Sequence, residues 1–218
     1  MIRRFLGVFL CGLLFLIALS SFIFCQFRLQ DNFNQTRDRL MLIASNSAQA
    51  ISADEVFNVP LEQRSEGTAE YLIVYQKLLK IKEVNPCVKY AYIMTSTNQP
   101  GILQYVVDAD PVPQIITAKC PTALPGDRYD ARRFPEMMNA YDKPSADKLI
   151  TSDAWGTFIS GYAPIVDTNG KSIAILGIDT DAAPIQVMQK RAKLAGQAVL
   201  VTGFLFVILF AATLLKFQ

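Results

Sequence analysis

The side chains best suited to hold a small molecule are aromatic residues with polar tips, spread over the middle of the chain. They are Tyr90, Tyr92, Tyr105, Tyr129, Trp155 and Tyr162. Such residues enclose a ligand with their ring faces and orient it with a hydroxyl or an indole N–H. Aromatic residues in strands also serve as plain core, so the sequence leaves both interpretations open.

The candidate charged contacts are four aspartates, Asp127, Asp130, Asp179 and Asp181. Asp179 and Asp181 lie two positions apart, so on an extended strand both carboxylates project from one side, where they could meet an amine or a cation. Asp181 has a second interpretation as the cap of a helix that contains Pro184 in its first turn. Three arginines could instead hold a carboxylate ligand or form solvated surface: Arg128, Arg132 and Arg133.

Composition excludes several function classes. The chain contains no His, which removes Ser-His-Asp and Cys-His nucleophile systems and His-based metal sites. A net charge of +2, from 21 basic and 19 acidic residues, lacks the basic excess of a nucleic-acid binder. We expect no cofactor and no enzymatic activity. The enzymatic alternative would use Asp127 and Asp130 as a carboxylate acid and base.

Two uncharged apolar segments, Phe5 to Phe24 and Leu194 to Leu215, are each long enough to cross a bilayer of about 30 Å as a helix. We therefore predict transmembrane helices at 5–25 and 194–215 and one domain at 26–193, with short ends at 1–4 and 216–218. Arg3, Arg4 and Lys216 place both ends in the cytoplasm and the domain outside it. A cleaved signal peptide is the alternative for the first segment, but residues 22–26 offer no cleavage site.

Cysteine positions add a clue to the compartment. Cys87 and Cys120 are the only two cysteines well inside the predicted domain, and an oxidising exterior would let them pair. Cys87 opens the first predicted strand and Cys120 follows the second, and antiparallel pairing returns the chain to the same end of the sheet. We predict a Cys87–Cys120 disulfide, with two unpaired thiols as the alternative.

The domain has an alternating order of helices and hairpins. We expect helices at about 26–50 and 68–84, a hairpin of 88–95 with 102–108, and an irregular crossover at 109–148 with a short helix near 134–141. A second hairpin of 155–166 with 172–179 follows, and then one continuous helix from about 182 to 216. The apolar run Ile173 to Ile178 is typical of a central strand covered on both faces. The fold class is α+β.

The first long helix carries a stripe at spacings of four and three, which is Leu29, Phe33, Thr36, Leu40, Ile43, Ser47 and Ala50. This stripe could pack on a twin helix in a homodimer or on the sheet of its own domain. The polar Thr36 and Ser47 make it a poor coiled-coil seam, so both arrangements stay open.

Four stretches in this order resemble the PAS-like extracytoplasmic sensor domains called Cache or PDC domains, which lie between two membrane spans of bacterial receptors. The stretches are Tyr71 to Tyr92, Pro125 to Asp130, Trp155 to Ile165 and Leu176 to Asp181. The resemblance implies a PAS-like antiparallel sheet with a long N-terminal helix, and a pocket on one sheet face under the crossover.

From the resemblance and the residue types together, we expect the ligand to meet seven side chains: Tyr92, Tyr105, Asp127, Tyr129, Trp155, Tyr162 and Asp179. The expected partners are a small molecule, the membrane, a second copy of the chain and a cytoplasmic output module absent from this sequence. The expected location is the bacterial inner membrane. The sequence leaves open whether the ligand is an amino acid, an amine or a carboxylate. The alternative function is a structural or partner-binding membrane module without a ligand.

Overall fold

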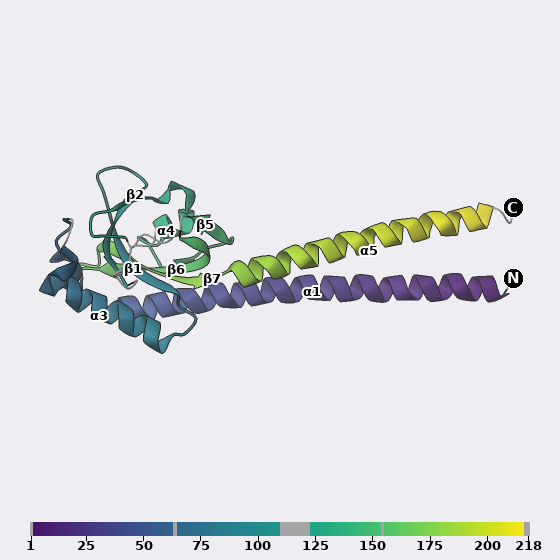
Figure 1. The fold of residues 1–218 in the computed structure, drawn as a ribbon, viewed down its shortest axis with the longest axis horizontal. Coiled ribbons are helices and arrows are strands. Elements are labelled where there is room, and N and C mark those ends of the chain that lie inside the picture. The colour runs from purple at the N-terminus through teal and green to yellow at the C-terminus, as the bar shows by residue number, and fades with distance from the viewer. Residues whose placement is uncertain (1, 63–64, 110–122, 154, 216–218) are drawn as a thin grey trace. The chain divides into compact units, whose positions relative to one another are not determined.

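The computed structural model describes residues 2–62, 65–109, 123–153 and 155–215 (Figure 1). The chain divides into two compact units. One, which we call the helical unit, comprises Met1–Asn34 and Pro184–Gln218, and the other, which we call the sheet domain, comprises Gln35–Ala183.

The helical unit is built from the long helices α1 (Ile2–Ala48) and α5 (Ala183–Leu215). Each contains a stretch long and apolar enough to cross a membrane. A Cβ atom added at Gly196 would lie 2.2 Å from the Phe22 ring, and one added at Gly203 would lie 2.2 Å from the Phe15 ring. The two glycines therefore let aromatic rings of α1 pack directly against the α5 backbone, as small residues do in membrane helix pairs. The predicted continuous helix is found, over Ala183–Leu215 of the described residues.

Within the described residues, the sheet domain contains a seven-stranded antiparallel sheet in the order β3-β2-β1-β7-β6-β4, with β5 pairing to β6. The strands are β1 (Tyr90–Ser96), β2 (Ile102–Asp108), β3 (Arg128–Asp130), β4 (Ser145–Ala146), β5 (Thr151–Asp153), β6 (Gly156–Val166) and β7 (Ser172–Asp181). Both predicted hairpins, β1–β2 and β6–β7, are present. The central strand β7 is buried on both faces, as its apolar run predicts, because Ala174, Ile175, Leu176 and Ile178 are all 0% exposed.

Helices pack on this sheet and cap its connections. α2 (Ala53–Phe57) begins with a capping box of Ser52 and Glu55, and Thr68 caps α3 (Ala69–Val84). The Tyr71 hydroxyl donates to the carbonyl of Asp108, which fixes α3 against β2. Further short helices in the described part of the domain are η1 (Ser65–Gly67), η2 (Ala131–Arg133) and α4 (Pro135–Asn139).

The end of α1 packs against its own sheet. Leu40 is 1% exposed, and a Cβ atom added at Gly161 of β6 would lie 2.5 Å from the Leu40 carbonyl carbon. Of the two arrangements left open for the stripe, the structure therefore places Leu40 in intradomain packing. The homodimer stays a prediction.

Candidate ligand-binding site

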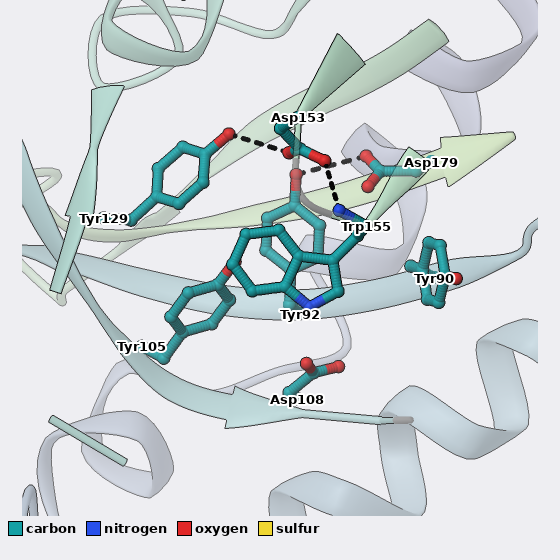
Figure 2. A pocket seen from close by; sticks show the side chains of 8 residues that line it. All are labelled: Tyr90, Tyr92, Tyr105, Asp108, Tyr129, Asp153, Trp155 and Asp179. Carbon is teal, nitrogen blue, oxygen red and sulfur yellow. Dashed lines mark hydrogen bonds between the residues drawn. The ribbon is translucent and has the colours of Figure 1, made fainter. Parts of the chain in front are cut away.

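A small pocket opens on one face of the sheet. Eight side chains from six segments of the sheet domain line it (Figure 2), and they are Tyr90, Tyr92, Tyr105, Asp108, Tyr129, Asp153, Trp155 and Asp179. This combination of aromatic faces and carboxylates in a concave site is typical of a small-molecule site.

The register of the central strands places the first two groups of the site. Tyr90 of β1 pairs with Asp179 of β7, and Tyr92 pairs with Gly177. A Cβ atom at Gly177 would lie 2.3 Å from the Tyr92 ring, so the glycine allows the ring to lie across β7. The Tyr92 hydroxyl then reaches the next inward-facing residue of β7 and donates to Asp179 Oδ1 at 3.1 Å.

The remaining rings form a cluster of edge-to-face and tilted pairs. Tyr105 lies 5.9 Å from Tyr92, 6.1 Å from Tyr129 and 6.3 Å from Trp155, measured between ring centroids. Tyr129 and Trp155 also contact each other at 6.0 Å. Such pairs hold each other's orientation, so the aromatic wall is formed before any ligand arrives. Burial raises the pKa of Tyr92, Tyr105 and Tyr129, so the phenols of the wall remain neutral.

Asp108 and Asp179 are the two buried carboxylates of the pocket wall, at 6% and 7% exposure. Burial raises the pKa of Asp179 to about 8, and the neighbouring carboxylates of Asp147 and Asp153 act in the same direction. Hydrogen bonds from Ser160 and Tyr92 oppose the shift only in part. Asp179 is therefore mostly protonated at neutral pH, and a cation placed beside it would favour its ionised form.

Asp153 lies beside Asp179 in the pocket (Figure 2). Its carboxylate accepts the Tyr129 hydroxyl at 3.0 Å and the backbone N–H of Trp155 at 2.8 Å. These two hydrogen bonds connect Tyr129 of β3 and Trp155, which directly precedes β6, to one carboxylate. Among the eight lining residues of the described chain, three carry carboxylates and none is basic. The pocket can therefore surround a positively charged group with rings and carboxylates, which attract it.

Five of the seven side chains predicted to meet a ligand line this pocket: Tyr92, Tyr105, Tyr129, Trp155 and Asp179. The other two lie elsewhere. The Asp127 carboxylate accepts the backbone N–H of Leu124 in a turn, and the buried Tyr162 donates its hydroxyl to Asp147. Ligand binding by any of the seven stays a prediction.

Tyr90, Asp108 and Asp153 also line the pocket but are absent from the seven predicted residues. Tyr90 is nevertheless one of the six aromatic candidates that the sequence indicates, and it alternates with Tyr92 on the same strand. Asp181, considered as a ligand contact or a cap, accepts the N–H of Ala183 and caps α5. Arg132 pairs with Asp130, and Arg128 donates to Gln99, so these groups stand apart from the pocket.

Cys87 is partly buried just before β1, whereas Cys120 lies outside the described residues. The predicted disulfide between them stays a prediction. Within the described part of the chain, no group of three or more His, Cys, Asp or Glu side chains could hold a metal ion.

The chain is similar to known proteins in its three-dimensional structure. No family model matches the chain, and no curated protein matches it. The sensor domain of the V. cholerae histidine kinase DctB matches with a TM-score of 0.51 and 11% identity, over 78% of this chain and 58% of that one.

The sensory domain of the Campylobacter jejuni chemoreceptor Tlp3 with isoleucine bound gives a TM-score of 0.49, with 12% identity over 84% of this chain and 64% of that one. The ligand-binding domain of Tlp3 in complex with L-valine gives 0.45, also with 12% identity and the same coverage. This chain thus spans less than two thirds of the length of these solved chains. At 11% identity, the similarity to the DctB domain establishes a common fold. The fold of the chain therefore confirms the predicted resemblance to PAS-like Cache and PDC sensor domains.

Proposed function

We propose that this chain is the input region of a membrane receptor, whose sheet domain binds a small molecule with a positively charged amino group. The observation that carries the proposal is the pocket itself, where Asp179 and Asp153 stand among four tyrosines and Trp155. The fold shared with a histidine-kinase sensor domain supports a sensor role. The amino group would lie beside Asp179, with its substituent against the aromatic wall.

The route of the signal follows from the connection between the site and α5. Asp179 lies in β7, and α5 begins at Ala183, directly after that strand. A ligand that favours one position of β7 would shift the start of α5, and the energy would come from its different affinity for the two positions. We propose that α5 crosses the bacterial inner membrane, that the sheet domain lies outside the cytoplasm, and that two copies act together on a cytoplasmic output module.

Two lysines beside Tyr90 bear on the class of the ligand. Lys89 Nζ lies 5.1 Å and Lys82 Nζ lies 6.0 Å from the centroid of the Tyr90 ring. A ligand that also carries a carboxylate could extend towards this end of the pocket, as an amino acid would. The amino group nevertheless remains the part that the site requires, because a cation beside Asp179 favours the ionised form of that carboxyl.

A thermal-shift panel with matched compounds tests this function on the full chain in lipid nanodiscs. We expect isopentylamine to raise the melting temperature, because a ligand selective for the folded state stabilises it by mass action. Isopentanol and 4-methylpentanoate share its hydrocarbon and lack its positive charge, and should give no shift. L-leucine adds a carboxylate, and a larger shift than with isopentylamine would indicate a contribution from the lysine end. Equal shifts with the amine and the carboxylate, or no shift with any compound, would contradict the proposal.

A further inference from the structure

The positive charge of this chain is concentrated in the helical unit. The two segments of that unit, residues 1–34 and 184–218, contain seven Lys and Arg side chains and one acidic side chain, Asp31, which gives a charge of +6. The sheet domain contains the other 14 basic and 18 acidic residues, which gives −4 and accounts for the total of +2. A unit built from two apolar helices therefore carries the whole basic excess of the protein.

The packing of α1 against α5 shows which residues of the two helices lie at the same level. Three contacts between the helices pair Gly12 with Phe206, Phe15 with Gly203 and Phe22 with Gly196. In each pair the two residue numbers add up to 218, so the helices are antiparallel and keep one register. The same register places Phe24 of α1 level with Leu194 of α5, and these are the residues at which the two uncharged apolar segments end. Sequence and packing therefore agree on one boundary of the apolar region.

Four exposed cations, which we call the basic belt, lie directly beyond this boundary: Arg28 on α1 and Lys190, Arg191 and Lys193 on α5. At about 1.5 Å per residue, Arg28 lies about 6 Å beyond Phe24, and Lys190 lies about 6 Å beyond Leu194. The headgroup layer of a bilayer extends about 5 to 8 Å beyond the hydrocarbon on each side. In a membrane that covers the two apolar segments, the basic belt therefore lies at the depth of the lipid phosphates.

The charges of the basic belt are directed outward. Within the described residues, the ion pairs of the chain use cations of the sheet domain, and none of them uses a cation of the belt. Asp31, the one acidic residue of the helical unit, lies about one turn beyond Arg28 on α1. The belt and Asp31 together carry a charge of +3. Long basic side chains at this depth can rest their stems on acyl chains and hold their charges among phosphates.

We propose that the basic belt is an interaction surface for anionic phospholipids, at the membrane face from which the chain continues into the sheet domain. Three of the four cations are on α5, which directly follows β7. A movement of α5 along its axis by one turn, about 5.4 Å, would take these cations out of the phosphate layer or into hydrocarbon, where a charge is costly. Anionic lipid thus holds α5 at one depth. The proposal rests on the proposed function for the membrane crossing, and its test needs no ligand of the sheet domain.

Native mass spectrometry of the full chain, titrated in detergent with phosphatidylglycerol or phosphatidylcholine, measures the affinity for each lipid. We expect phosphatidylglycerol to bind more tightly to the wild-type chain, and high salt to weaken this preference. The triple variant Lys190→Gln, Arg191→Gln and Lys193→Gln should weaken phosphatidylglycerol binding on the order of 100-fold, at about fivefold per lost cation, and leave phosphatidylcholine binding unchanged. Arg28→Gln alone should weaken it about fivefold.

A matched control removes three exposed cations from the sheet domain, through Arg133→Gln, Lys143→Gln and Lys171→Gln. Its affinity for phosphatidylglycerol should stay within about twofold of wild type, because these side chains lie outside the belt. Far-ultraviolet circular dichroism confirms that each variant keeps its helices.

Four results would overturn the proposal. Equal affinity of the wild-type chain for the two lipids is the first, and an unchanged preference in the belt variant is the second. A control variant that loses the preference would assign it to total charge, and displacement of phosphatidylglycerol by an equal concentration of inorganic phosphate would indicate a site for free anions. If isopentylamine fails to bind while the belt variant loses its lipid preference, the proposed ligand class is wrong and the basic belt remains. If isopentylamine binds while the two lipids bind alike, the basic belt is wrong and the ligand class remains.

Discussion

Replacing Asp179 with asparagine is expected to raise the stability of the sheet domain near pH 8 by a few kcal/mol. The folded state holds the pKa of Asp179 at about 8, mainly through burial, whereas an aspartate in an unfolded chain titrates near pH 4. Folding therefore favours the protonated acid. Its contribution is complete below about pH 4 and is lost as the pH rises towards 8, at up to about 1.4 kcal/mol per pH unit. Asparagine carries no charge and keeps the shape of the side chain.

The pH range in which stability falls identifies the carboxyl group that causes the loss. The pKa of Asp147 is raised to about 6. The contribution of Asp147 to the stability of the domain is therefore lost only between about pH 4 and 6. Glu55 and Glu136 have lowered pKa values, so their contributions to stability have the opposite pH dependence. These contributions are lost as the pH falls below the usual titration range of a glutamate. Urea unfolding of the wild-type chain should thus show stability that falls from about pH 6 to 8, and Asp179→Asn should flatten this part of the curve. A slope that is unchanged in the variant would show that Asp179 is not buried as an acid.

The same substitution is expected to weaken isopentylamine binding on the order of 100-fold, because removal of one partner of a buried charge pair costs about 2 to 5 kcal/mol. Asp127→Asn is the matched control. The asparagine amide oxygen can still accept the Leu124 N–H, and the side chain stands outside the pocket, so amine affinity should stay within about twofold of wild type. Calorimetric titration of both variants measures the difference. If Asp127→Asn weakens binding as strongly as Asp179→Asn does, the site has been assigned to the wrong aspartate.

Much of the fold follows from local patterns in the sequence. The period of the apolar residues predicts the two hairpins, the buried β7 and the continuous α5. Aromatic residues on β1 and an aspartate near the end of β7 predict the centre of the pocket. These features depend on residues close together in the chain, which is why a pattern can reveal them.

The rest of the site depends on long-range geometry. Tyr105 and Asp108 are three apart and would face opposite sides of a regular strand. The β1–β2 pairing shifts register between Ile93 and Met94, however, and both residues reach the pocket. Asp153 enters on the three-residue β5, too short to show a period, because β5 pairs with β6. Tyr162 shares the aromatic pattern of the site, but its hydroxyl turns to Asp147, a contact that no spacing indicates.

The affinity of the full chain for isopentylamine, measured by calorimetry from about pH 6 to 9, tests the central claim most directly. A cation binds the ionised form of Asp179, so the apparent affinity is reduced by the fraction of that form. With a pKa of about 8 in the free site, affinity should rise about tenfold per pH unit up to about pH 8 and then level off, with isopentanol binding weakly at every pH. Affinity that does not change with pH, or isopentanol that binds as tightly as the amine, would contradict the claim that this pocket recognises a cation through Asp179.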